Sequence, residues 1–81
     1  MTLRLQPVQV ETGSDDTESR LVFAGERLVA VLVRLSDRHE SDAGKWFLEV
    51  GFGRVDDPRK PIFVDLREAE HWISGRLAQA R

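Results

Sequence analysis

Near its C-terminus the chain reads Phe63-Val64-Asp65-Leu66-Arg67-Glu68-Ala69-Glu70-His71-Trp72-Ile73, the pattern of a short strand that runs directly into an amphipathic helix. Asp65 is a good N-cap, because its carboxylate can accept the free N–H groups of the first helical turn. Glu68 lies three residues later and can reach back to the N–H of Asp65, which would complete a capping box. The pattern predicts a helix from Leu66 to about Gln79.

One face of this predicted helix is apolar. A helix with such a face must bury it against another element, and the segments upstream have to supply the surface. The apolar face carries Leu66, Ala69, Ile73, Leu77 and Ala80, with Trp72 on its flank.

Strand patterns fill the chain before this helix. Apolar residues gather in five runs that are separated by polar or glycine-containing loops. Gly25-Glu26 predicts a tight hairpin turn, because glycine takes the positive φ that such a turn requires. Pro7 cannot donate to a ladder, so the first strand is expected at an edge of the sheet or with a bulge there. The predicted strands are residues 3–10, 21–24, 28–35, 45–52 and 62–64.

Two of these strands indicate which faces are buried. The side chains of residues 28–35 are apolar on both sides of the predicted strand as far as Arg34. This pattern is typical of a central strand that is covered on both faces. Residues 45–52 alternate cleanly, as the strands of a half-buried antiparallel sheet do. Their apolar face carries Trp46, Leu48, Val50 and Phe52, and the other face carries Phe47, Glu49 and Gly51.

Strands followed by one helix predict an α+β fold. We expect an antiparallel sheet of four to five strands with the C-terminal amphipathic helix packed on one face, in a single domain of residues 1–81. One helix covers only one face of a sheet. The other face would expose the apolar residues from one side of the predicted strands. These are either Val29, Val31, Val33, Leu35 and Phe47 or the apolar residues that alternate with them.

Such an apolar face is typical of a partner site. The sequence therefore predicts a homodimer that is built sheet to sheet or edge to edge. The alternative is that the N-terminal strand or the long loops of the same chain fold over this face.

Composition narrows the class of protein. The 81 residues include no cysteine, so disulfides, thiolate metal sites and cysteine nucleophiles are ruled out. The net charge of −2 does not favour nucleic acid as a partner. The first ten residues do not form the apolar core of a signal peptide, and no apolar run approaches the roughly 20 residues of a membrane span. We expect a cytoplasmic protein without a cofactor.

Acidic residues and the two histidines are the candidates for chemistry. The loop Glu11–Ser19 has four carboxylates, but calcium needs six to eight converging oxygens, so a solvated loop is favoured. His39 stands near Asp37, Glu40 and Asp42, yet a zinc site needs three or four ligands and His71 is the other histidine of the chain. We predict no metal site and no catalytic residue, and an enzyme that uses His39 or His71 stays the alternative.

The stretch Gly51-Phe52-Gly53-Arg54 is the candidate binding segment. Glycines let a backbone approach a ligand closely, and arginines grip phosphate or carboxylate through two hydrogen bonds. The alternative is a bend at a strand end, followed by a solvated loop in which Asp56 and Asp57 offset the basic residues. The predicted binding residues are Phe52, Arg54, Arg59 and Lys60, with Phe52 or Trp46 available to stack on a base.

These patterns lead to two functional hypotheses. The first is a non-catalytic interaction or regulatory module that self-associates through its sheet, with a further protein partner also compatible. The second is a module that binds an anion or nucleic acid through the segment around Arg54 and the Arg59-Lys60 pair.

Overall fold

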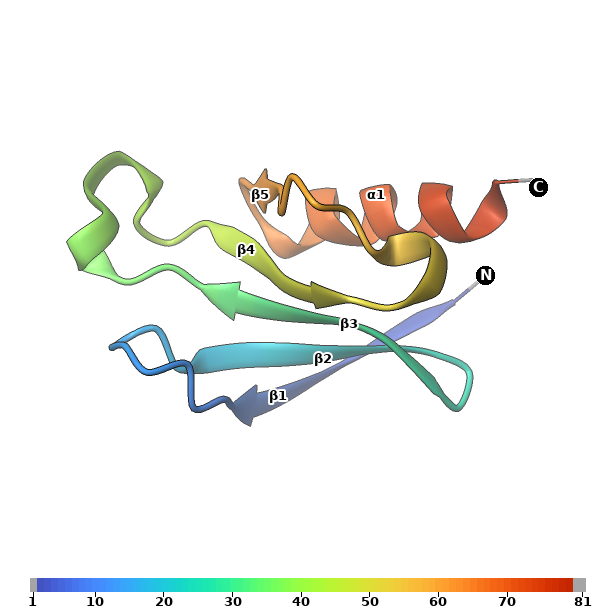
Figure 1. Ribbon diagram of the computed structural model, residues 1–81, viewed down its shortest axis with the longest axis horizontal. Coiled ribbons are helices and arrows are strands. Elements are labelled where there is room, and N and C mark those ends of the chain that lie inside the picture. Colours follow the sequence, from blue (N-terminus) through green and yellow to red (C-terminus); the bar gives the residue numbers. More distant parts are fainter. Residues whose placement is uncertain (1, 80–81) are drawn as a thin grey trace.

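The computed structural model describes residues 2–79, and it confirms the predicted α+β architecture. Five antiparallel strands form one sheet in the order β1-β2-β3-β4-β5, and the C-terminal helix α1 packs against it (Figure 1). Each strand pairs with its neighbour in the sequence, so the sheet is a meander. Its elements are β1 (Leu3–Gln9), β2 (Glu18–Ala24), β3 (Arg27–Arg34), the 3₁₀ helix η1 (Asp37–Asp42), β4 (Trp46–Gly51), the 3₁₀ helix η2 (Gly53–Val55), β5 (Ile62–Phe63) and α1 (Leu66–Ala78).

The start of α1 has the predicted N-cap hydrogen bond of Asp65, but the hydrogen bond of Glu68 goes to a different residue than predicted. The Asp65 carboxylate accepts the N–H of Glu68 at 2.9 Å. The Glu68 carboxylate accepts the N–H of Val64 at 2.6 Å, one residue before the N–H of Asp65 that a capping box uses. The glutamate therefore ties the residue that follows β5 to the first turn of the helix.

The hydrophobic core lies between α1 and one face of the sheet. Ala69 and Ile73 of α1 are fully buried there, and Phe63 packs on Trp72 with ring centroids 5.5 Å apart. Ala80, predicted on the same helix face, lies outside the described residues. The buried residues of the core are Val22, Val29, Ala30, Leu32, Trp46, Leu48, Val55, Phe63, Ala69 and Ile73.

Two β-bulges change the predicted faces of the sheet. One extra residue at Val29 shifts the β2–β3 register, and another at Glu49 shifts the β3–β4 register. A shift of one residue moves every later side chain to the opposite face. Val50 therefore pairs with Val31 away from the core and Phe52 is 47% exposed, so the predicted alternation through Trp46, Leu48, Val50 and Phe52 is wrong beyond Leu48. The predicted grouping of Val29 with Val31 and Val33 on one face is also wrong, since Val29 belongs to the core.

We call the sheet surface opposite α1 the open face. It is predominantly apolar, and most of its side chains are half-buried. Val33 is buried on it, and the guanidinium of Arg4 lies 4.3 Å from the centre of the Phe23 ring. The cross-strand register places on it the rows Arg4–Phe23–Leu28, Gln6–Leu21–Val31–Val50 and Val8–Ser19–Val33–Phe47–Ile62.

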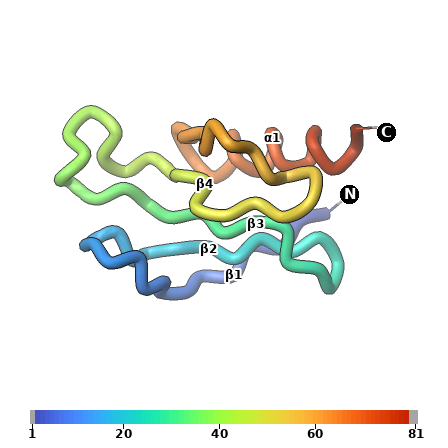
Figure 2. The backbone as a smooth tube through the Cα atoms, in the orientation of Figure 1, coloured from blue at the N-terminus to red at the C-terminus, as the bar shows by residue number. Residues whose placement is uncertain are grey.

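The hairpin between β2 and β3 determines which loops meet. Gly25 has a φ of +64° and begins the predicted two-residue turn. From this turn the two strands run side by side to the opposite end of the molecule, where the chain before β2 and the chain after β3 emerge together (Figure 2). Pro7 lies on the edge strand β1, as predicted, in regular register with Arg20 and without a bulge.

Within residues 2–79 no helix has the length and apolar character needed to cross a membrane.

Candidate functional site

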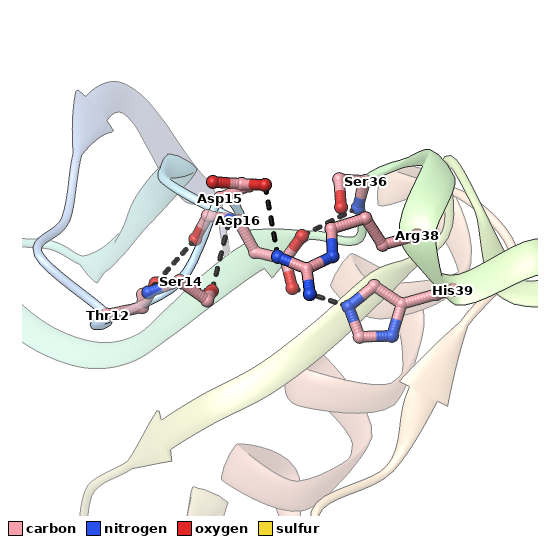
Figure 3. A network of polar contacts seen from close by, with 7 residues as sticks. All are labelled: Thr12, Ser14, Asp15, Asp16, Ser36, Arg38 and His39. Carbon is pink, nitrogen blue, oxygen red and sulfur yellow. Dashed lines mark hydrogen bonds and ion pairs between the residues drawn. The ribbon is translucent and has the colours of Figure 1, made fainter.

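Two polar loops that are far apart in the sequence meet at one end of the sheet, and we call their contact the loop junction. It joins Asp15 and Asp16, just before β2, to Ser36, Arg38 and His39, just after β3 (Figure 3). The N–H of Ser36 donates to Oδ1 of Asp16 at 2.8 Å, and Nε2 of His39 lies within hydrogen-bonding distance of Oδ2. Arg38 forms an exposed ion pair with Asp15 at 3.2 Å.

Asp16 is the centre of the loop junction. Contact with Ser36 is the main cause that lowers the pKa of Asp16 from its ordinary 3.8 to about 2, and the hydrogen bond and charge of His39 add to this effect. Desolvation by burial opposes it. Asp16 is therefore ionised at neutral pH and holds both loops through one carboxylate.

A cavity of about 240 Å³ lies between the two loops and the open face. Its apolar residues are Val33, Leu35, Phe47 and Ile62, which belong to the sheet and the residues that flank its strands. Its polar residues are Thr12, Ser14, Asp16, His39, Asp42 and Glu49. The cavity thus combines an apolar floor with a rim that carries three carboxylates.

The three carboxylates of the rim are satisfied to different degrees. Asp16 is bound within the loop junction, and Asp42 accepts a hydrogen bond from Lys45 at 3.1 Å. The Glu49 carboxylate forms no hydrogen bond or ion pair with the described residues, because the nearby ammonium of Lys60 donates to the Glu49 backbone carbonyl instead, at 2.7 Å. Glu49 is the bulged residue of β4, and bulges commonly redirect a side chain in this way.

The candidates for metal binding and acid–base chemistry are not assembled into one site. No three His, Asp or Glu side chains among residues 2–79 are grouped closely enough to hold a metal ion. His39 lies at the loop junction, whereas His71 is exposed on α1 and lines no part of the cavity. Asp65 and Glu68 serve as the caps of α1.

Of the predicted binding residues, Arg54 and Lys60 form hydrogen bonds within the chain, and Phe52 is exposed to solvent. Arg54 donates to the backbone carbonyls of Leu77 and Gln79 at 3.1 and 2.8 Å, at the end of α1. Lys60 binds the Glu49 carbonyl, as described above. Phe52 is an exposed ring. Arg54 and Lys60 thus donate to acceptors on different segments of the chain, and anion binding stays a prediction.

Arg59, the fourth predicted binding residue, belongs to an internal ion-pair network. Its guanidinium donates to both carboxylate oxygens of Asp57 at 3.0 and 2.8 Å, and Arg76 of α1 donates to the same carboxylate at 3.2 Å. Asp57 is only 3% exposed. The hydrogen bonds of Arg59, together with the charges of both arginines, hold the pKa of Asp57 well below its usual range. The network fastens the loop before β5 to the helix.

The two glycines of the Gly51-Phe52-Gly53 segment have local structural reasons. A Cβ atom on Gly51 would stand 2.7 Å from the carbonyl carbon of Val55 and 2.9 Å from the N of Asp56. Gly53 has a φ of +59°, which L-residues rarely adopt. The close approach that the glycines permit is therefore that of η2 to the end of β4.

The loop junction and the cavity are absent from the sequence-based prediction, which treated residues 11–19 and 36–44 as separate solvated loops. The signal that locates them is the Gly25-Glu26 turn. Counting outward along both strands from this turn, with one residue added for the bulge, leads to Asp16 opposite Ser36.

Comparison with protein-family models, with curated proteins and with solved structures finds no match to this chain.

Proposed function

We propose that this protein is a non-catalytic interaction module that forms a homodimer through the open face of its sheet. The observation that carries this proposal is the sheet surface opposite α1, to which each of the five strands contributes at least one apolar side chain. Contiguous apolar patches of this kind usually mark an interaction site.

The extent of the open face limits how tightly a second copy can bind. Four inter-strand spacings of about 4.8 Å, multiplied by about seven residues of 3.4 Å along a strand, give an upper limit of about 450 Å² for this face. This is the size of the largest patch on a typical monomer and is smaller than the roughly 800 Å² per partner of a standard interface. We therefore expect a dimer that dissociates at low concentration.

Contact through the faces is favoured over contact through the edges. β1 is a free edge strand, but Pro7 in its middle lacks the N–H that an added strand would need. At the other edge, β5 is only two residues long. Neither edge offers a long continuous row of donors and acceptors.

The test is the molar mass in solution, measured by size-exclusion chromatography with light scattering across about 10 to 500 μM. The unaltered chain should move from monomer towards dimer as concentration rises. Val31→Lys places a charge in the middle row of the open face and should keep the protein monomeric, while the lysine stem can still lie along the sheet.

The matched control is Ala78→Lys, which adds the same charge at an exposed position of α1 and should leave dimerisation unchanged. Circular dichroism establishes that both variants are folded. A chain that stays monomeric at every concentration, or a folded Val31→Lys variant that dimerises like the parent, contradicts the proposal.

A further inference from the structure

We propose that the cavity beneath the loop junction binds a small organic cation, namely an amine with a short aromatic or aliphatic body. The proposed dimer contact depends on apolar side chains alone, whereas this site also depends on carboxylates. Val33, Phe47 and Ile62 contribute to both surfaces.

The volume of the cavity and its apolar lining determine the size of the apolar part of the ligand. A dry cavity of about 150 Å³ is enough to hold benzene. The cavity here measures about 240 Å³, so it has room for one ring and a short chain. Val33 and Leu35 are almost completely buried, so the accessible apolar contact comes mainly from Phe47 and Ile62. Drug-sized molecules usually need more than about 300 Å³, so they are too large for it.

The rim sets the charge of the ligand. Three of the lining residues are carboxylates, and none is lysine or arginine. His39, whose ring is the one nitrogen-bearing side chain among the lining residues, is already held by Asp16. Since the Glu49 carboxylate has no partner among the described side chains, an ammonium group at the mouth would gain a new ion pair without breaking an existing one.

The walls of the cavity are already in position without a ligand. Thr12 donates to the backbone carbonyl of Asp16 at 3.0 Å, and its hydroxyl lies 2.9 Å from that of Ser14. Asp16 in turn fixes the second loop through Ser36 and His39. A site whose walls are held by such bonds loses little conformational freedom on binding.

The experiment is an NMR titration of the full chain with three probes that share a phenylethyl group: phenethylamine, 2-phenylethanol and 3-phenylpropionate. Phenethylamine should give saturable shifts of amides at the cavity, with a dissociation constant of about 1 mM, as expected for a ligand of nine heavy atoms. The neutral alcohol should bind more weakly, and the carboxylate should give no saturable shift.

Glu49→Gln removes the unpartnered charge and should weaken phenethylamine binding about two- to five-fold, the range expected for a partly exposed ion pair, while leaving the alcohol unaffected. Glu70→Gln makes the same change at an exposed position of α1 and serves as the control.

Equal binding of the amine and the alcohol, or the absence of saturable shifts at the cavity, overturns the proposal. A dimer through the open face would cover Val33, Phe47 and Ile62, so the titration is repeated at chain concentrations from about 50 to 500 μM: amine binding that weakens as the concentration rises indicates competition with the dimer, and binding absent at the lowest concentration indicates that the cavity does not bind the amine.

Discussion

Gly51 shows how a single residue can resemble a ligand-binding signature while serving the fold. Because a Cβ atom there would stand 2.7 Å from the Val55 carbonyl carbon, Gly51→Ala must displace η2 from the end of β4. Overpacking of this kind costs about 1–3 kcal/mol. At about 4–8 °C per kcal/mol for a domain of this size, thermal unfolding followed by circular dichroism should show a midpoint lowered by about 5–20 °C.

Gly75→Ala is the control for this residue-scale prediction. Gly75 lies inside α1, and a Cβ atom there would meet nothing within 4 Å. The same substitution should therefore raise the stability by about 1 kcal/mol, because alanine is the better helix former. If both variants shift the midpoint in the same direction, the steric account of Gly51 is wrong.

At the scale of elements, the end of α1 depends on a residue that the sequence suggested as an anion ligand. Arg54→Ala removes the two hydrogen bonds to the carbonyls of Leu77 and Gln79, each worth about 0.5–1.5 kcal/mol. We expect faster amide hydrogen exchange in the last turn of α1. Arg67→Ala removes an arginine that has no hydrogen bond or ion pair with the described residues, and it should leave exchange there unchanged. Unchanged exchange in Arg54→Ala would show that the cap is dispensable.

The helix and the strands could be predicted from the sequence, but the bulges within the strands could not. The five strands, the Gly25-Glu26 turn and a helix beginning at Leu66 were all predictable, because apolar periodicity and capping chemistry leave a local mark. The bulges at Val29 and Glu49 leave no such mark, since one extra residue changes the register without changing the composition. The open face is therefore predicted only in part, and the cavity is not predicted, because it also depends on the contact between two loops that are far apart in the sequence.

At the scale of the whole molecule, two ionised carboxylates connect parts of the fold that are distant in the sequence. Asp16 joins the two loops at the end of the sheet, and Asp57 joins the loop before β5 to α1. The pKa of each is lowered in the folded state. Their contribution to the free energy of unfolding is therefore complete above the unfolded pKa and is lost as the pH falls through the folded pKa.

This linkage predicts a specific window of acid sensitivity. For Asp16 the loss should begin near pH 4 and extend to about pH 2, because its pKa falls from 3.8 to about 2 on folding. The measurement is the urea midpoint at several pH values from 7 to 2. Asp16→Asn should lower the midpoint at pH 7, and it should also reduce the decline between pH 4 and pH 2, because the variant has no proton to bind at this position. Asp37→Asn removes a carboxylate that has no hydrogen bond or ion pair among the described residues, so it serves as the control. A decline in Asp16→Asn as steep as that of the parent would mean that the loop junction contributes nothing to the pH dependence, and the sensitivity would then be attributed to other carboxylates, first to Asp57, whose pKa is also lowered by its contacts with arginine.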